Sequence, residues 1–468
     1  MTDWFPDLTR SSSPRYIAIA DLIEMDLRDG MLAAGDRLPP QRELARRLGI
    51  DFTTVARGYV EARNRGLVDT QVGRGTFVTG HTAHRGWNGD TATFDPDPRR
   101  ASAADLSMNL PPEPEDPGLL DRMRAGLGAV AADLVPLLRY QEFGGAEMDK
   151  EAAALWLSRR GVSAPTERIF ITPGAHPALL AVVGMLTKPG ETILSEQITY
   201  PGIRSIAAQL RLQIAGLPMD EQGILPDALE AACRGKAPKA LYLNPTLQNP
   251  TTLTVPAARR AAISAIADRF GIPIVEDDAY GFISPDAPPP LAAFAPHITW
   301  HIAGLSKCIG AGLRLAYVLA PATKAAWPFV AAMRASNVMA SPLNTALLTR
   351  WIEDGTADDL LQFVRTETAH RQEIAASLLA AETYRASPQS FNIWLTLRNG
   401  WNRSNFTAHT RSCGLGVVSS DAFTVEGPAS ETVRVCLGGP IGRDRLASAL
   451  DFMAHALAGP PEMTGSFF

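Results

Sequence analysis

The stretch GLSKCIGAGLRLAYVLA, residues 304–320, decides more about the fold of this chain than any other. The strand-like run TWHIAG ends at its first residue, Lys307 follows three residues later, and Arg314 comes seven residues after the lysine. A lysine amine is reactive when it is partly desolvated, because burial disfavours its charged form. The end of a buried strand offers such a position, and the planar guanidinium of Arg314 can pair with a phosphate group. The stretch therefore predicts a reactive lysine and a phosphate-binding arginine at one edge of a sheet.

Strand-like and helical segments alternate on both sides of this stretch. The apolar runs that are expected to form strands are RIFIT, ETILS, ALYLN, IPIVE, TWHIAG and AYVLA, with helical stretches between most of them. Such alternation predicts a mostly parallel sheet covered by helices, an α/β fold. Sheets of this kind bind ligands at the carboxyl ends of their strands, and the polar motifs of this chain follow those ends.

Two further segments supply side chains that a pyridoxal phosphate site requires. In IVEDDAYGF, Asp277 follows a buried strand, and Tyr280 lies three residues further on. Pyridoxal phosphate acts as an electron sink only while its pyridine nitrogen stays protonated, and a buried carboxylate such as Asp277 maintains that protonation. Tyr280 and Asn249, the latter from NPTLQNPTT, are expected to hydrogen-bond the ring hydroxyl. Lys307 would hold the cofactor as a Schiff base.

The segment ITPGAHPALL predicts the phosphate site. Gly174, Ala175 and His176 stand at the start of a helix, with Pro177 near its first position. Free backbone amides at a helix N-terminus bind phosphate groups. Tyr200, in ITYPG, is expected to stack on the cofactor ring.

In their order, spacing and residue types these motifs resemble the fold-type I aminotransferases, over about residues 105–468. The resemblance implies an α/β fold of the pyridoxal-phosphate-dependent transferase kind, with a smaller C-terminal α+β subdomain. It implies pyridoxal 5'-phosphate as the cofactor and Lys307 as the catalytic residue. The cofactor-binding residues that it implies are Lys307, Asp277, Tyr280, Asn249, Tyr200, Gly174, Ala175, His176, Ser306, Arg314 and Tyr140.

Arg434 and Tyr140 are assigned by the resemblance alone. Arg434, in TVRVCLGG, matches the arginine that binds a substrate α-carboxylate, and Asn249 is assigned to the same ligand. The alternative for Arg434 is a salt-bridged surface residue. Tyr140, in LRYQEFGG, matches the tyrosine that reaches the cofactor phosphate of the neighbouring subunit. The alternative for Tyr140 is a core tyrosine.

The sequence departs from the aminotransferase pattern at three positions. Gly304 replaces the first serine of S-x-S-K, Thr252 replaces the glycine of N-P-T-G, and Ala311 replaces the proline before G-x-R. Each change is expected to weaken cofactor retention or turnover without preventing the Schiff base. Cys308, beside Lys307, is interpreted as a small buried packing residue, and a redox sensor is the alternative.

The first 80 residues predict a separate, mainly helical module. Helices are expected over residues 13–30, 40–48 and 52–65, followed by the strand-like runs LVDTQ and TFVTG around a Gly-Arg-Gly turn. The second and third helices, separated by LGI, form a helix-turn-helix pattern. In this pattern the second of the two helices enters the major groove of DNA.

Residues 81–104 lack helical or strand periodicity and are rich in Asp, Pro, Gly and Arg. We interpret them as a linker between a domain over residues 1–80 and a domain over residues 105–468. The alternative is a long surface loop within one domain.

Three motifs of the N-terminal module resemble the GntR winged helix-turn-helix: LPPQRELARRLGI, DFTTVARGYVEARNRGLV and GRGTFV, in that order. By that resemblance the residues that contact DNA are Arg42, Thr53, Thr54, Arg57 and, from the wing toward the minor groove, Arg74. The family often has arginine where this chain has Phe52, so the operator is expected to differ there, or Phe52 to meet a thymine methyl. The alternative is that the small helices only dock on the large domain.

Charge and cysteine content limit the function classes. The net charge is −5, so DNA binding must be local, and residues 36–80 carry eight Arg against five acidic residues, a balance of +3. The four cysteines are scattered, which predicts neither a disulfide framework nor a metal site. The start MTDWFPDLTR is not typical of a signal peptide, and no run is long and apolar enough for a membrane span, so we expect a cytoplasmic protein.

A GntR-type reader followed by an aminotransferase-like domain is the arrangement of the MocR-type transcriptional regulators, a GntR subfamily that this chain resembles. The resemblance implies a homodimer, swapped head to tail, that binds pyridoxal phosphate and a double-stranded DNA operator. A small amino compound with a carboxylate would exchange with Lys307, form an external aldimine and so bias the DNA readers. Two alternatives stay open: an active aminotransferase with an appended DNA-binding module, and a sensor of the cofactor that needs no amino compound.

Overall fold

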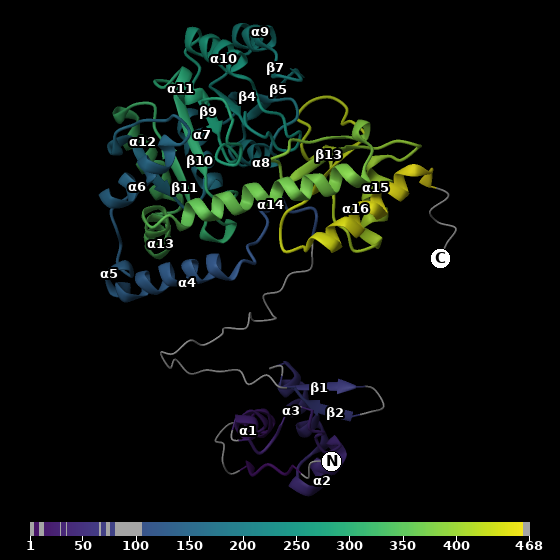
Figure 1. The fold of residues 1–468 in the computed structure, drawn as a ribbon. Coiled ribbons are helices and arrows are strands. Elements are labelled where there is room, and N and C mark those ends of the chain that lie inside the picture. The colour runs from purple at the N-terminus through teal and green to yellow at the C-terminus, as the bar shows by residue number, and fades with distance from the viewer. Residues whose placement is uncertain are drawn as a thin grey trace. The chain divides into compact units, whose positions relative to one another are not determined.

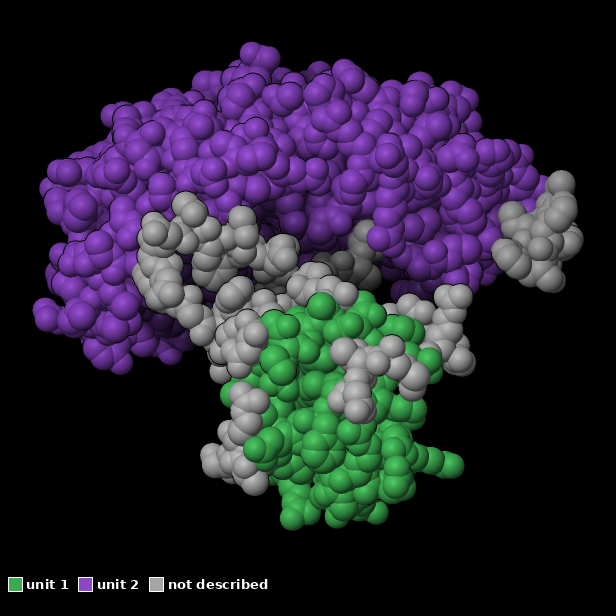
Figure 2. Space-filling view, turned by 60° about the horizontal axis from the view of Figure 1, so that its bottom comes forward, with its two compact units in different colours: residues 1–101 green, residues 102–468 purple. Residues whose placement is uncertain are grey.

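The structure, a computed structural model, describes residues 4–8, 14–28, 30–33, 35–64, 67–71, 75–79 and 105–461. The chain divides into two compact units, residues 1–101 and 102–468 (Figures 1 and 2). Each unit has its own core of buried apolar side chains. The predicted linker, residues 81–104, lies outside the described residues, so the domain boundaries stay predictions.

In its described residues the first unit contains three helices and a pair of antiparallel strands, as the sequence predicts. The helices are α1 (Arg15–Arg28), α2 (Gln41–Leu48) and α3 (Phe52–Asn64), and the antiparallel strands are β1 (Val68–Gln71) and β2 (Gly75–Val78). α1 and α3 approach closely at Gly58, where an added Cβ would lie 2.9 Å from the Cβ of Ile19. Leu22, Leu44 and Val55, one from each helix, are completely buried in a shared core.

Two local features form the turn between α2 and α3. Gly49 ends α2 in the left-handed conformation, with a φ of 62°, and its N–H donates to the carbonyl of Ala45. At the start of α3 the carboxylate of Asp51 accepts a hydrogen bond from the backbone N–H of Thr53 (2.8 Å). The predicted helix-turn-helix is therefore present.

The second unit is built on a seven-stranded sheet with the order β3-β11-β10-β9-β8-β4-β5 (Figure 1). Its strands are β3 (Ile169–Thr172), β4 (Thr192–Glu196), β5 (Gln213–Leu217), β8 (Ala240–Leu243), β9 (Ile274–Asp277), β10 (Thr299–Gly304) and β11 (Ala316–Leu319). β11 is antiparallel to both of its neighbours, and the other pairs are parallel. The six predicted strands are all present, and β5 joins them at the edge.

Helices cover both faces of this sheet, which explains why its strands are apolar throughout. The helices of this part of the unit are α4 (Pro117–Ala132), α5 (Leu134–Leu137), α6 (Glu147–Ser158), α7 (Ala175–Leu186), α8 (Pro201–Gln209), α9 (Pro226–Lys236), α10 (Ala257–Arg269), α11 (Leu291–Phe294), α12 (Ala326–Ser336) and α13 (Pro342–Glu353). Of these, α4 and α5 pack against α13. Alternate residues of β11 belong to different cores: Val318 packs with residues of α7, whereas Tyr317 and Leu319 pack with residues of α6 and α13. The strand register also positions the site, because it pairs Asp277, the last residue of β9, with Ile302 near the end of β10. The carboxyl ends of the central strands therefore meet at one edge.

A long helix, α14 (Thr356–Leu378), leads to a smaller C-terminal subdomain (Figure 1). The subdomain has an antiparallel sheet with the order β12-β13-β15-β14. Its elements are β12 (Tyr384–Arg385), β13 (Asn392–Thr396), α15 (Arg403–Ser412), β14 (Val418–Ser419), β15 (Thr432–Cys436) and α16 (Arg443–Ala458), and a short hairpin of β6 (Met219–Asp220) and β7 (Gly223–Ile224) lies outside both sheets. The predicted fold class, a mainly α module followed by an α/β transferase with an α+β subdomain, is confirmed.

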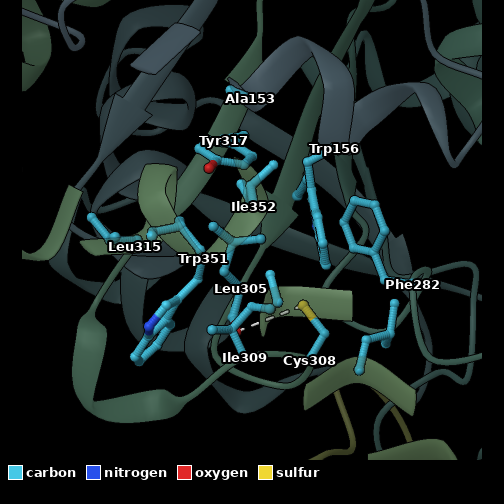
Figure 3. Close-up of a cluster of buried hydrophobic side chains, with 14 of the residues drawn as sticks. Ala153, Trp156, Phe282, Leu305, Cys308, Ile309, Leu315, Tyr317, Trp351 and Ile352 are labelled. Atoms are coloured by element: carbon cyan, nitrogen blue, oxygen red, sulfur yellow. Dashed lines mark hydrogen bonds between the residues drawn. The ribbon is translucent and has the colours of Figure 1, made fainter. Parts of the chain in front are cut away.

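The turn after β10 is anchored in a hydrophobic core (Figure 3). Leu305, Cys308 and Ile309 are buried there, in the same core as Trp156 and Phe282. The Cys308 thiol donates to the carbonyl of Leu305, and burial raises the pKa of the thiol to about 12. A thiol with so little thiolate near neutral pH acts as a packing residue. The packing interpretation of Cys308 is therefore favoured over the redox sensor.

Candidate functional site

Lys307 stands in the turn directly after β10, where its neighbours in sequence hold the backbone in place. Its side chain is half-buried, and its amine donates a hydrogen bond to the backbone carbonyl of Asn109. The amine lies 6.0 Å from the centre of the Tyr280 ring. Burial lowers the pKa of Lys307 to about 8, with Arg434 and Arg314 acting in the same direction. About a tenth of the amine is therefore uncharged at pH 7.

Asp277 ends β9 and is 5% exposed. Its Oδ2 atom accepts a hydrogen bond from the hydroxyl of Tyr242 (2.9 Å), while its Oδ1 atom has no partner among the described residues. Burial raises the pKa of Asp277 to about 6. Buried oxygens are normally paired, so an open one points to an absent N–H donor. A protonated pyridine nitrogen is such a donor.

Arg434, on β15, is 7% exposed, so the surface alternative for this residue is wrong. Its Nη1 donates to Oδ1 of Asn249 (2.8 Å), its Nη2 donates to the carbonyl of Ser107 (2.6 Å), and its guanidinium lies 5.1 Å from the ring centre of Phe423. Its Nε has no partner in the described part of the chain. The two residues assigned to a ligand carboxylate, Arg434 and Asn249, are thus in direct contact.

Gly174 and Arg314 meet at the N-terminus of α7. Gly174 precedes the helix with a φ of 106°, and a Cβ added to it would lie 3.2 Å from Nη2 of Arg314. The amides of Ala175 and His176 lie in the first turn, where helix N–H groups have no partner within the helix. Burial and the charge of Arg314 both lower the pKa of His176. Two free amides and a guanidinium at a helix N-terminus can hold a phosphate.

Ser306 and Tyr200 lie near these groups, whereas Tyr140 is an exposed residue. Ser306 is half-buried in the same turn as Lys307. Tyr200 precedes α8, and burial together with the charge of Asp277 raises its pKa. Tyr140 follows α5 and is 85% exposed, so the alternative of a core tyrosine is wrong. Its assigned role on a neighbouring subunit stays a prediction.

The structure adds residues that the sequence did not single out. Asn244, directly after β8, donates through Nδ2 to the carbonyl of Asp277 (2.6 Å) and accepts from the backbone N–H of Asn249 (2.9 Å). It thereby ties the end of β9 to the loop that carries Asn249. The position of Asn244 after a buried strand was a usable signal, as it was for Asp277. Asn109, by contrast, lies in a proline-rich stretch with no comparable signal.

A second group of buried charges lies beside Asp277. Burial alone would raise the pKa of Asp278, but Arg160 (3.1 Å), His301 and Arg260 hold it below its usual range. The completely buried Glu276 accepts hydrogen bonds from the backbone N–H groups of Leu291 and Ala292 and contacts Nδ1 of His301 (3.0 Å). These pairings compensate the charges of Glu276 and Asp278, the two acidic neighbours of Asp277 in the sequence.

In the first unit the predicted DNA-contacting residues cluster at α2 and α3. Arg42, Thr53 and Arg57 are exposed, and Thr54 is half-buried. Phe52, the first residue of α3, is 42% exposed, with the guanidinium of Arg42 5.8 Å from its ring centre. The guanidinium of Arg57 lies 4.1 Å from the ring centre of Tyr16, on α1. Arg74 lies outside the described residues.

Comparison with known proteins gives the same two modules. Residues 104–450 match the family described as aminotransferase class I and II. The chain belongs to this family. Residues 15–78 match the gntR family of bacterial regulatory proteins, so the N-terminal module of this aminotransferase-family chain is a DNA-binding one. In the part of the chain that the structure describes, no helix is both long enough and apolar enough to cross a membrane.

Relatives with the same arrangement are named as regulators. The uncharacterized HTH-type transcriptional regulator YdeF of Bacillus subtilis (strain 168) is 29% identical over 455 residues, 97% of this chain and 96% of that protein. The HTH-type transcriptional regulator TauR of Rhodobacter capsulatus is 26% identical over 350 residues, 68% of this chain and 69% of that protein. The chain is thus a regulator-type protein with an aminotransferase-like domain, consistent with the MocR type.

Solved structures show the same fold in the second unit. The α-aminoadipate aminotransferase LysN of Thermus thermophilus, complexed with N-(5'-phosphopyridoxyl)-L-leucine, has a TM-score of 0.68 at 23% identity, over 76% of this chain and 92% of that chain. The kynurenine aminotransferase of Pyrococcus horikoshii has a TM-score of 0.68 at 20% identity, over 77% of this chain and 92% of that one. The family implies pyridoxal phosphate as the cofactor. The site fits it, because Asp277 has an open oxygen, Lys307 a partly neutral amine, and α7 a phosphate cradle.

We predict that the pH dependence of cofactor uptake reflects the lowered pKa of Lys307. The reactive form is the neutral amine, whose share at pH 7 is about 300-fold larger for a pKa of 8 than for an ordinary lysine. The rate of pyridoxal phosphate uptake by cofactor-free protein, followed by stopped-flow absorbance, should rise with pH up to about 8 and then level off. Nα-acetyl-lysine serves as the control and should keep rising to about pH 10. A protein rate that also rises to pH 10 would contradict the lowered pKa.

We also predict that Asp277→Asn stabilises the cofactor-free protein. The folded-state pKa of Asp277 lies above its ordinary value, so the free energy of unfolding falls as pH rises from about 4 to 6 and stays lower above that window. At pH 7.5 the substitution should raise the free energy of unfolding by about 1–3 kcal/mol, and at pH 4 by almost nothing. Urea unfolding at both pH values measures this. Asp286→Asn, in an exposed loop, should change neither value. Equal effects at both pH values would refute the electrostatic cause.

Proposed function

We propose that this chain is a MocR-type, pyridoxal-phosphate-dependent transcriptional regulator that senses a carboxylate-bearing amino compound through exchange at Lys307. The observation that carries the proposal is the presence of both parts in one chain. The first unit exposes a GntR-type recognition helix, and the second holds Lys307, Asp277 and Arg434 around one site. DNA as the partner also supports a cytoplasmic location.

The residues of the site suit the binding of an amino acid. Pyridoxal phosphate, when bound, supplies an aldehyde carbon that condenses reversibly with primary amines. Lys307 leaves that carbon easily as a neutral amine, because burial lowers its pKa. Arg434 offers its guanidinium to a carboxylate, and Asn249 orients that guanidinium. A primary amine with a nearby carboxylate satisfies both ends of the site.

A working aminotransferase is the second candidate, because the intact Lys307, Asp277, Asn249 and Arg434 are all in place. Two features favour the sensor. Gly304 lacks the hydroxyl that enzymes of this pattern offer to the phosphate. Thr252 has a φ of 63° at a position where the family has glycine, and a β-branched residue there is strained. The strain lies in the loop that carries Asn249.

We propose that the chain acts as a head-to-tail homodimer. α4, α5 and the residues after them expose large apolar side chains: Leu127 (57%), Val135 (64%), Leu138 (68%) and Tyr140 (85%). Such a cluster is typical of a covered surface in the assembled protein. In the dimer, Tyr140 would reach the cofactor phosphate of the partner subunit.

We predict that amino acids produce a single spectral change without sustained turnover. Purified protein with pyridoxal phosphate is incubated with a panel of amino acids and 2-oxo acids, and both absorbance and oxo-acid product are followed. Sustained product formation would favour the enzyme instead, and an effect of the cofactor alone on DNA binding would favour the cofactor sensor. Lys307→Ala should lose the visible absorbance of cofactor held by the lysine. Survival of that absorbance would overturn the assignment of Lys307.

We predict that Arg42→Ala reduces the salt dependence of DNA binding. If Arg42 contacts a phosphate, its removal lowers the slope of log affinity against log salt by about 1 on a duplex of arbitrary sequence. Arg46→Ala is the matched control, because it removes the same charge from the same helix but Arg46 is paired with Glu43 (2.6 Å). Equal slopes for the two variants would remove Arg42 from the phosphate contacts.

A further inference from the structure

The residues that follow the predicted linker run directly through the site. We call residues 105–112 the lead-in segment. Leu106 is completely buried in the core of the small subdomain, and its carbonyl accepts a hydrogen bond from the backbone N–H of Cys436 (2.8 Å). Pro111 accepts in the same way from Gly439 (3.0 Å). The segment is therefore packed along the strand that carries Arg434.

The main chain of this segment is hydrogen-bonded to both Arg434, which is assigned to the ligand, and Lys307, which is assigned to the cofactor. The carbonyl of Ser107 accepts from Nη2 of Arg434 (2.6 Å), and the carbonyl of Asn109 accepts from the amine of Lys307. These are the groups that would receive the carboxylate and give up the cofactor when an amino acid binds. The segment and the ligand thus share their partners.

The side chain of Asn109 fixes the segment between the two sheets. Asn109 is 8% exposed, and its Nδ2 donates to the hydroxyl of Tyr280 (2.8 Å) and, more weakly, to Oδ1 of Asn392 (3.4 Å). Tyr280 follows β9 of the large sheet, and Asn392 begins β13 of the small one. Oδ1 of Asn109 is buried with no partner among the described residues. Asn109 is therefore a buried polar group of the site with hydrogen-bonding capacity left over.

A carboxylate that binds Arg434 at two points uses Nη2, the same nitrogen that donates to Ser107. Nη2 carries two N–H groups, one on each face, so the carboxylate displaces Ser107 when it takes the face that Ser107 occupies. A guanidinium offers two bidentate faces, one through Nη1 and Nη2 and one through Nε and Nη2, and both use Nη2. Nη2 is the atom that now donates to Ser107, and Nη1 donates to Asn249. The face through Nε is the more open, because Nε has no partner among the described residues.

We infer that Asn109 and the lead-in segment form the part of the site that responds to the carboxylate of a ligand and not to its amine. The inference rests on the proposed exchange at Lys307. In that exchange the ligand amine would take the cofactor's carbon from Lys307, and the two hydrogens lost by the ligand nitrogen would pass to the lysine nitrogen. Lys307 would then be a free amine, which can donate to Asn109. A ligand carboxylate takes Nη2 of Arg434 from Ser107, whereas an amine without a carboxylate leaves that bond intact. The carboxylate, rather than the amine, therefore releases Ser107 from Arg434 and makes the lead-in segment less tightly held.

Hydrogen–deuterium exchange of the full-length, cofactor-loaded protein tests this inference. The probes are L-alanine and ethylamine, which differ only in the carboxylate, and absorbance is recorded in parallel to measure occupancy of the site. L-Alanine should accelerate exchange in peptides covering residues 105–112 and 433–439 by about fivefold or more, because opening of a hydrogen-bonded segment governs exchange. Ethylamine at equal occupancy should leave both peptides unchanged.

Variants of the segment separate its role from general stability. Asn109→Ala removes the contact with Tyr280, so it should raise the affinity for L-alanine by about threefold to tenfold and leave that for ethylamine unchanged. Glu113→Ala changes an exposed side chain just outside the segment and should alter neither affinity. If absorbance changes with L-alanine but exchange does not, the inference fails and the proposed function stands. If neither probe changes the absorbance, the proposed function fails as well.

Discussion

The burial of one primary amine is the constraint on which the second unit depends. Lys307 sits at the end of a strand that is buried on both faces, in a turn fixed by Leu305, Cys308 and Ile309. The same low dielectric that lowers the pKa of Lys307 raises that of Asp277, so each group is held closer to neutrality than it would be in water. The packing that stabilises the sheet therefore also shifts the pKa values of Lys307 and Asp277.

Such a site is costly to fold, and the surrounding polar groups offset part of that cost. Tyr242 stabilises one oxygen of Asp277, while Arg160 and the N-terminus of α11 compensate its two acidic neighbours. Oδ1 of Asp277, Oδ1 of Asn109 and Nε of Arg434 are among the buried atoms without partners in the described residues. Buried polar atoms that are left open at a site are available for hydrogen bonds to a ligand.

The sequence predicted the parts of this site that follow from strand ends, and missed those that depend on tertiary contact. Lys307, Asp277 and the glycine before α7 were predictable because each lies at the end of a buried strand or shortly after it. Their grouping followed from the parallel order of the central strands. Asn109 and Ser107 were not predictable, because they come from a segment without periodicity that reaches the site by packing along β15. The exposure of Tyr140 could not be predicted either, since the sequence LRYQEFGG is compatible with both a buried and an exposed tyrosine.

Gly304 has a consequence for how such proteins change over time. A Cβ at this position would make only ordinary contacts, 3.5 Å from the Cβ of Ala175 and 3.5 Å from the Cα of Ala279, and the backbone needs no positive φ there. The fold does not impose this glycine, and a single codon change to serine would restore the hydroxyl beside α7. At this position a lineage can therefore move toward or away from the aminotransferase pattern without rebuilding its core.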